Sequence, residues 1–156
     1  MRFTRIISPL SLLMAMACHF QDRTPGSTRH DEAALQSAAT AFYQALGRGD
    51  SAALRRVTLP TATALIAPDR GPAVQIPVAA LFDARERREQ SGGARIARTE
   101  LHPDGDVATV RLVVVAGSLD GQGEYEAADV LTLARRDGGW LVAHAVLGTW
   151  RIRSAP

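Results

Sequence analysis

The pattern of apolar and polar positions divides the chain into a helical first half and a strand-rich second half. From Arg29 onward, apolar residues recur every three or four positions, which predicts an amphipathic helix that Thr28 caps and Gly47 ends. Its apolar stripe contains Leu35, Ala38, Phe42 and Leu46, and the opposite side carries Gln36, Thr40 and Gln44. We expect the apolar stripe to pack against another element.

Two further helices are predicted before the strands begin. Asp50 is placed to cap a short helix over Ser51–Val57. Pro77 is placed at the first turn of a third helix over Val78–Gln90, because a proline there loses no helical hydrogen bond. The segment 60–68 lies between prolines and is rich in β-branched residues, so no helix is assigned to it.

The second half of the chain has the character of a β-sheet. Its predicted strands are Arg95–Leu101, Val107–Ala116, Glu124–Arg135 and Trp140–Trp150. The short turns between them favour an antiparallel meander. Helices followed by strands are typical of an α+β fold in which the helices cover one face of a sheet.

Both faces of two predicted strands, Val107–Ala116 and Trp140–Trp150, are largely apolar. A sheet that is covered on one side only should carry polar residues on its solvent face. Two explanations stay open: a homodimer formed sheet to sheet, or burial of central strands within one monomer.

The N-terminus is typical of an export signal. Two arginines lie within residues 1–5, and an apolar run follows and ends in Ala15-Met16-Ala17. The run is too short to span a bilayer as a permanent helix. We therefore predict a signal peptide over residues 1–17.

Cys18, the single cysteine, comes directly after this signal and resembles the cysteine of a bacterial lipobox, although Ala15 stands where leucine is usual. Lipidation of Cys18 explains an unpaired cysteine in an exported protein. The alternatives are ordinary cleavage that leaves a free thiol, and a cytosolic product that starts at Met14 or Met16. We expect a tether over residues 18–28 and one domain over residues 29–153.

Charge excludes one class of partner. The chain has no lysine, and removal of the signal leaves 16 arginines against 16 acidic residues. No stripe of arginines interleaved with aromatic residues is present, so we expect no nucleic-acid partner.

The order of elements, the "GRGD" between the first two helices and the closing "RRDGGWLVAHAVLGTW" together resemble the nuclear-transport-factor-2-like superfamily. That group includes SnoaL-like polyketide cyclases, ketosteroid isomerases and scytalone dehydratase. The resemblance covers Glu32 to Trp150, and "DGGWLVAH", Asp137 to His144, is its most specific part.

The resemblance implies an α+β, cystatin-like cone with helices packed in the concave face of a curved, mainly antiparallel sheet. It also implies a pocket inside the cone and frequent dimerisation through the outer face. It does not imply one activity, because this fold is shared by enzymes and non-enzymes.

Asp129 and His144 are the candidate catalytic residues. Asp129 alternates in step with Leu131 and Leu133, so a pocket-facing Asp129 would serve as a proton acceptor. His144 alternates in step with Trp140, which places it toward the pocket as an acid, base or donor. A β-bulge would turn either side chain to the other face of the sheet. The alternative for both residues is a purely structural role.

An aromatic wall for an apolar ligand is the candidate binding site. Its residues are Phe42, Tyr43, Tyr125, Trp140 and His144. The alternative is that they form the core. The remaining histidines are scattered, so neither a metal site nor a cofactor is predicted.

These observations predict a bacterial envelope lipoprotein on the periplasmic side, held by a lipid anchor. The residue after Cys18 is His19, not Asp, which favours the outer membrane. Its domain binds a small apolar molecule or an envelope protein of unknown identity. The alternatives are a cofactor-free isomerase, dehydratase or cyclase that uses Asp129 and His144, and a purely structural homodimer.

Overall fold

The computed structural model describes residues 25–68, 70–82, 94–117 and 123–153. Its elements are α1 (Pro25–Arg48), α2 (Ser51–Val57), β1 (Thr58–Ile66), β2 (Val74–Pro77), the 3-10 helix η1 (Val78–Phe82), β3 (Arg95–Asp104), β4 (Val107–Gly117), β5 (Glu124–Arg136), β6 (Gly139–Leu147) and β7 (Arg151–Ile152). The predicted signal peptide, Cys18 and most of the tether lie outside the described residues.

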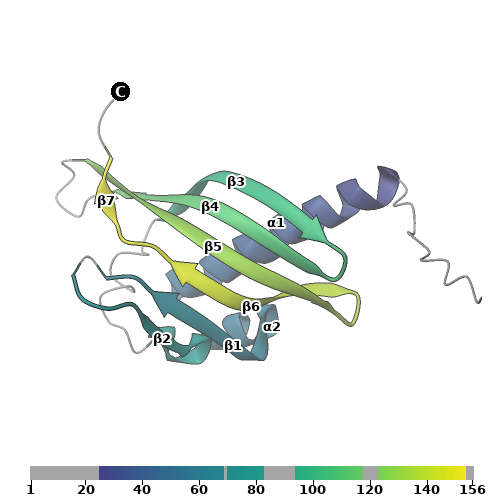
Figure 1. Cartoon of the computed structure of the whole chain (residues 1–156), viewed down its shortest axis with the longest axis horizontal. Coiled ribbons are helices and arrows are strands. Elements are labelled where there is room, and N and C mark those ends of the chain that lie inside the picture. The colour runs from purple at the N-terminus through teal and green to yellow at the C-terminus, as the bar shows by residue number, and fades with distance from the viewer. Residues whose placement is uncertain (1–24, 69, 83–93, 118–122, 154–156) are drawn as a thin grey trace, which may run out of the picture.

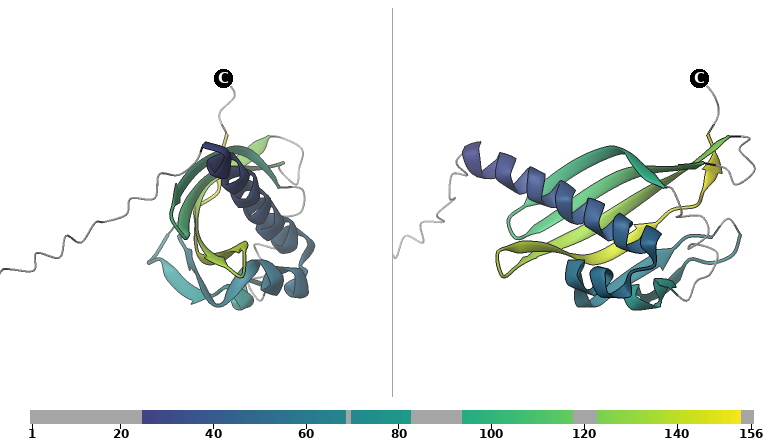
Figure 2. Two further views of the ribbon diagram at one scale, coloured as in Figure 1. Left: turned by 90° about the vertical axis from the view of Figure 1, so that its right-hand side faces the viewer. Right: turned by 180° about the vertical axis from the view of Figure 1, so that it is seen from behind.

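One seven-stranded sheet forms the body of the fold, in the order β2-β1-β6-β5-β4-β3, with β7 paired to β5 (Figure 1). Only β1 and β6 run parallel, and the other pairs are antiparallel. The sheet curves, and α1 crosses its concave side (Figure 2). The α+β architecture predicted from the order of helices and strands is confirmed.

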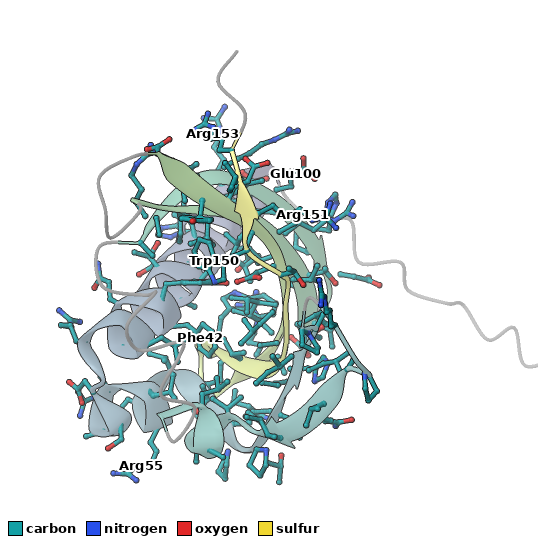
Figure 3. All side chains as sticks on the ribbon, turned by 90° about the vertical axis from the view of Figure 1, so that its left-hand side faces the viewer. Phe42, Arg55, Glu100, Trp150, Arg151 and Arg153 are labelled. Atoms are coloured by element: carbon teal, nitrogen blue, oxygen red, sulfur yellow. The ribbon has the colours of Figure 1, made fainter. Side chains whose placement is uncertain are left out.

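The core lies between α1 and the concave face of the sheet. Of the predicted stripe of α1, Leu35 and Phe42 are fully buried, as are their neighbours Ala39 and Ala45, whereas Ala38 and Leu46 are partly buried. The fully buried residues belong to one apolar cluster with residues of the central strands, among them Val110, Leu112, Leu131, Leu133, Val142 and Leu147. Figure 3 shows Phe42 in this interior, whereas Arg55 and Arg153 point to the periphery. Burial of a side chain as large as Phe42 contributes about 1.5–3 kcal/mol.

The ends of the helices differ from the sequence prediction. α1 begins at Pro25 and not after a cap at Thr28, so residues 25–28 belong to the helix and not to the tether. A proline at the first helical position loses no hydrogen bond, which makes this earlier start favourable. Asp50 caps α2 as predicted, because its carboxylate accepts from the backbone N–H of Ala53 at 2.8 Å.

The segment between α2 and β3 also differs. Residues 58–66 form β1, which pairs with β6, and residues 74–77 form the edge strand β2. Long-range pairing with a distant strand decides this structure, and no local pattern reveals it. Of the predicted third helix, residues 78–82 form a 3-10 helix, and residues 83–90 lie outside the described residues.

The outer face of the sheet carries Val113, Val130 and Val146, which are half-buried. The predicted homodimer through this face stays a prediction. Neither described α-helix is long and apolar enough to cross a membrane.

Candidate functional site

A cleft opens between α1 and the edge strand β3, with a volume of about 840 Å³. One wall consists of Gln36, Thr40, Tyr43, Gln44, Gly47 and Arg48 of α1, and the other consists of residues 94–99 and Leu101. The right-hand view in Figure 2 shows α1 lying obliquely over the sheet beside β3. The cleft lies along the open edge of the fold, outside the packed core.

The α1 wall follows from helical spacing. Gln36, Thr40 and Gln44 are four positions apart, so they lie on one face of the helix. The sequence pattern places this stripe opposite the core, and the structure uses it to line the cleft. All three side chains are uncharged and can both donate and accept hydrogen bonds.

The β3 wall is shaped by an irregularity in strand pairing. The register with β4 shifts between Ile96 and Arg98, which leaves Ala97 as an extra residue. On the far side of this bulge, Thr99 is opposite Leu112 and Leu101 is opposite Val110, both of which are core residues. Thr99 and Leu101 therefore share the concave face of the sheet with the core and form the floor of the cleft.

Tyr43 connects the cleft to a buried carboxylate. Its hydroxyl donates to Oδ2 of Asp129, and the backbone N–H of Gly148 donates to Oδ1 at 2.7 Å. Asp129 is only 3% exposed, so each carboxylate oxygen needs a donor. Asp129 on β5 thus holds α1 on one side and the segment after β6 on the other.

Gly148 can occupy its position only because it has no side chain. A Cβ at this residue would lie 2.3 Å from the carbonyl oxygen of Ala128. This close approach over β5 brings the Gly148 N–H within reach of Asp129. The sequence shows the glycine but gives no indication of its partner.

The predicted direction of Asp129 is correct, and that of His144 is wrong. Asp129 is buried on the concave face with Leu131 and Leu133. In β6, however, His144 pairs with Thr132 and Val142 with Leu133, so one extra residue lies between them. This bulge turns His144 to the outer face.

His144 is held on that outer face by a partner from β1. Its Nδ1 shares a hydrogen bond of 2.8 Å with the hydroxyl of Thr63. Asp129 and His144 therefore lie on opposite faces of the sheet, and one ligand position cannot reach both. A catalytic role for either residue stays a prediction.

The predicted aromatic wall is mostly core. Phe42 is fully buried and Trp140 is 6% exposed, whereas Tyr125 is at the end of β5 opposite Ile152. The guanidinium of Arg135 lies 4.5 Å from the centre of the Trp140 ring, and Arg135 also bonds Asp31 of α1 at 2.6 Å. Of the predicted ligand-binding residues, only Tyr43 lines the cleft.

Both walls of the cleft contain arginine residues. Arg48, Arg95 and Arg98 are among its lining residues. Hydrogen bonds from Arg95 and then Arg153 hold the pKa of the Glu124 carboxyl below its ordinary value. None of these arginines was predicted from the sequence as a site residue, and neither were Thr99 or the polar stripe of α1. The sequence did carry a signal for the polar stripe of α1: Gln36, Thr40 and Gln44 are polar but uncharged, whereas exposed helix faces usually carry charged residues.

A second, smaller cavity of about 280 Å³ lies between α2, β1 and η1. Its lining is largely apolar and includes Leu54, Leu59, Ala62 and Val78, with Ser51 and Arg55 as polar members. No group of three or more metal-binding side chains forms among the residues that the structure describes.

Residues 30–147 match the protein family described as "Putative lumazine-binding". The chain belongs to this family. The match spans α1 to the end of β6, which includes both walls of the cleft. A comparison with curated proteins found no match.

Solved structures with a similar fold include nuclear-transport-factor-2-like proteins, which confirms the cystatin-like fold. One of unknown function from Silicibacter pomeroyi is 23% identical, with a TM-score of 0.56, over 81% of this chain and 98% of that one. One with a cystatin-like fold from Novosphingobium aromaticivorans is 20% identical, with a TM-score of 0.59, over 82% and 90%. A "putative ketosteroid isomerase" from Shewanella frigidimarina is 16% identical, with a TM-score of 0.56, over 74% and 92%.

The hydrogen bond between Tyr43 and Asp129 gives a testable prediction for stability. The substitution Tyr43→Phe removes the donor and leaves one oxygen of a buried carboxylate without it. We expect the free energy of unfolding to fall by about 1–3 kcal/mol in urea denaturation.

The matched control is Tyr125→Phe, because Tyr125 is the other tyrosine of the chain and is 37% exposed. Its free energy of unfolding should stay within about 0.5 kcal/mol of the wild type. Equal effects of the two substitutions would contradict the role assigned to the Tyr43 hydroxyl.

Proposed function

We propose that this protein is an exported, membrane-anchored binding protein that holds a small heteroaromatic molecule of the lumazine type in the cleft between α1 and β3. One observation carries the proposal. The lining of the cleft, which has a volume of about 840 Å³, includes four uncharged side chains that both donate and accept hydrogen bonds: Gln36, Thr40, Gln44 and Thr99. Its volume falls within the range of roughly 300–1,000 Å³ that is usual for small-molecule sites.

The chemistry of the lining supports a ring rich in oxygen and nitrogen. Lumazine is a pteridine whose ring carbonyls accept hydrogen bonds and whose ring N–H groups donate them. The amides of Gln36 and Gln44 and the hydroxyls of Thr40 and Thr99 offer both functions. A purely apolar ligand would leave these groups without partners, so this proposal replaces the expected apolar molecule.

The floor of the cleft supports a flat ligand. Ile96 and Leu101 provide apolar surface on β3, and the Tyr43 ring provides aromatic surface on α1. The Tyr43 ring packs edge-on against Phe42, with 5.6 Å between ring centres. Because its hydroxyl is also bonded to Asp129, this ring is fixed before a ligand arrives, which reduces the entropy lost on binding.

Binding is favoured over acid–base catalysis. Both oxygens of Asp129 accept hydrogen bonds from the protein, and His144 lies on the other face of the sheet. Neither residue is among those that line the cleft. The proposed site therefore lacks the pair of titratable groups on which the enzymatic alternative depends.

Titration of the full-length protein with lumazine tests this function. We expect saturable binding by isothermal titration calorimetry. The substitution Thr40→Trp should fill the cleft and weaken binding about tenfold or more. The matched control is Ala79→Trp, because Ala79 is exposed and lines the smaller cavity instead.

The two variants separate the possible results. Binding lost in Thr40→Trp and kept in Ala79→Trp supports the cleft as the site. Absence of lumazine binding in the wild type refutes the proposed ligand class, and equal affinity in wild type and Thr40→Trp refutes the cleft.

The anchor is the second part of the proposed function. The sequence around Cys18 supports export, cleavage before this residue and attachment of lipid. We expect intact-mass analysis of membrane-extracted protein to show a chain that begins at Cys18 and carries added lipid mass. A chain that begins at Cys18 but carries no added lipid mass would refute the anchor and leave the proposal for the binding site unaffected.

A further inference from the structure

The mouth of the cleft has an excess of positive charge. Three of the residues that line it are arginines, and none of its described lining residues is aspartate or glutamate. Arg48 comes from the last turn of α1, and Arg95 and Arg98 come from the first residues of β3. Two elements that are far apart in sequence thus contribute arginine residues to the lining of one opening.

Nearby carboxylates neutralise this charge only in part. Arg98 pairs with Glu100 at 2.6 Å. Arg95 pairs with Glu124 at 3.0 Å, but Arg153 binds the same carboxylate at 2.8 Å, so two cations share one anion. The lowered pKa of Glu124 reflects these two arginines.

Arg48 is the available cation at this mouth. It forms no ion pair with any residue that the structure describes, and its side chain is on an exposed helix position. The hydrogen bond from the backbone N–H of Ala53 is the main cause that lowers the pKa of Asp50, with a smaller contribution from the charge of Arg48, and Asp50 does not line the cleft. A guanidinium in this situation binds carboxylate or phosphate groups with paired hydrogen bonds.

We propose that the natural ligand of the cleft is anionic: a heteroaromatic ring that carries a carboxylate or a phosphate, with the ring between α1 and β3 and the anionic group at Arg48. This inference rests on the proposed function and adds to it the charge of the ligand. The ring meets the uncharged donors and acceptors of the walls, and the anion meets the arginines of the mouth. Because these arginines are exposed, the contribution of charge falls as salt screens it.

A pair of ring compounds that differ in charge tests the inference. Lumazine and carboxylumazine, in which the same ring carries a carboxylate, are titrated separately into the full-length protein by isothermal titration calorimetry. At low salt we expect carboxylumazine to bind about tenfold more tightly than lumazine. Raising the salt concentration to about 0.5 M should remove most of this difference.

Matched arginine variants locate the effect. The substitution Arg48→Gln should reduce the preference for carboxylumazine over lumazine to about twofold or less. The control Arg56→Gln removes an exposed arginine of α2 that does not line the cleft, and it should keep the full preference. Melting temperatures of both variants check that they fold.

Each result decides between the two proposals. Equal affinity of the wild type for both compounds overturns the anionic ligand and leaves the proposed function standing. A preference that persists in Arg48→Gln overturns the role of Arg48. If neither compound binds, the proposed function fails, and the inference built on it fails as well.

Discussion

The carboxylate of Asp129 is the constraint on which the rest of this structure depends. It is buried in the sheet, and it accepts hydrogen bonds from the hydroxyl of Tyr43 on α1 and from the backbone of Gly148 after β6. A buried carboxylate without such donors would cost several kcal/mol. Its presence therefore fixes the height of α1 above the sheet and the path of the chain beyond β6.

This constraint also positions the cleft. Tyr43, which is tied to β5, lines the cleft together with the polar stripe of α1, and this stripe faces β3 across an open edge. The fold thus separates two tasks. Central strands and the apolar stripe of α1 form the core, while the edge strand and the polar stripe line the cleft that we propose as the ligand site. Such a division allows one scaffold to serve many functions.

The sequence predicted the parts of the fold that depend on periodicity. The stripe of α1, the cap at Asp50 and the four strands of the meander follow from local patterns. β1 escaped prediction because it pairs with β6, which is far away along the chain. The bulge next to His144 was not predicted, because an extra residue in a strand leaves the alternation of apolar and polar positions intact on each side. This bulge turns His144 to the face of the sheet opposite to the one predicted. Most of the predicted aromatic wall lies in the core for a related reason: large aromatic residues such as Phe42 and Trp140 indicate burial in general, and no local pattern distinguishes a core from a pocket.

The central claim is that the cleft between α1 and β3 is the ligand site. Chemical-shift mapping by NMR of the full-length protein during titration with lumazine tests it most directly. We expect the largest shifts at the backbone amides of Thr40, Gln44 and Thr99. Shifts confined to Ser51, Leu59 and Val78, around the smaller cavity, would contradict it.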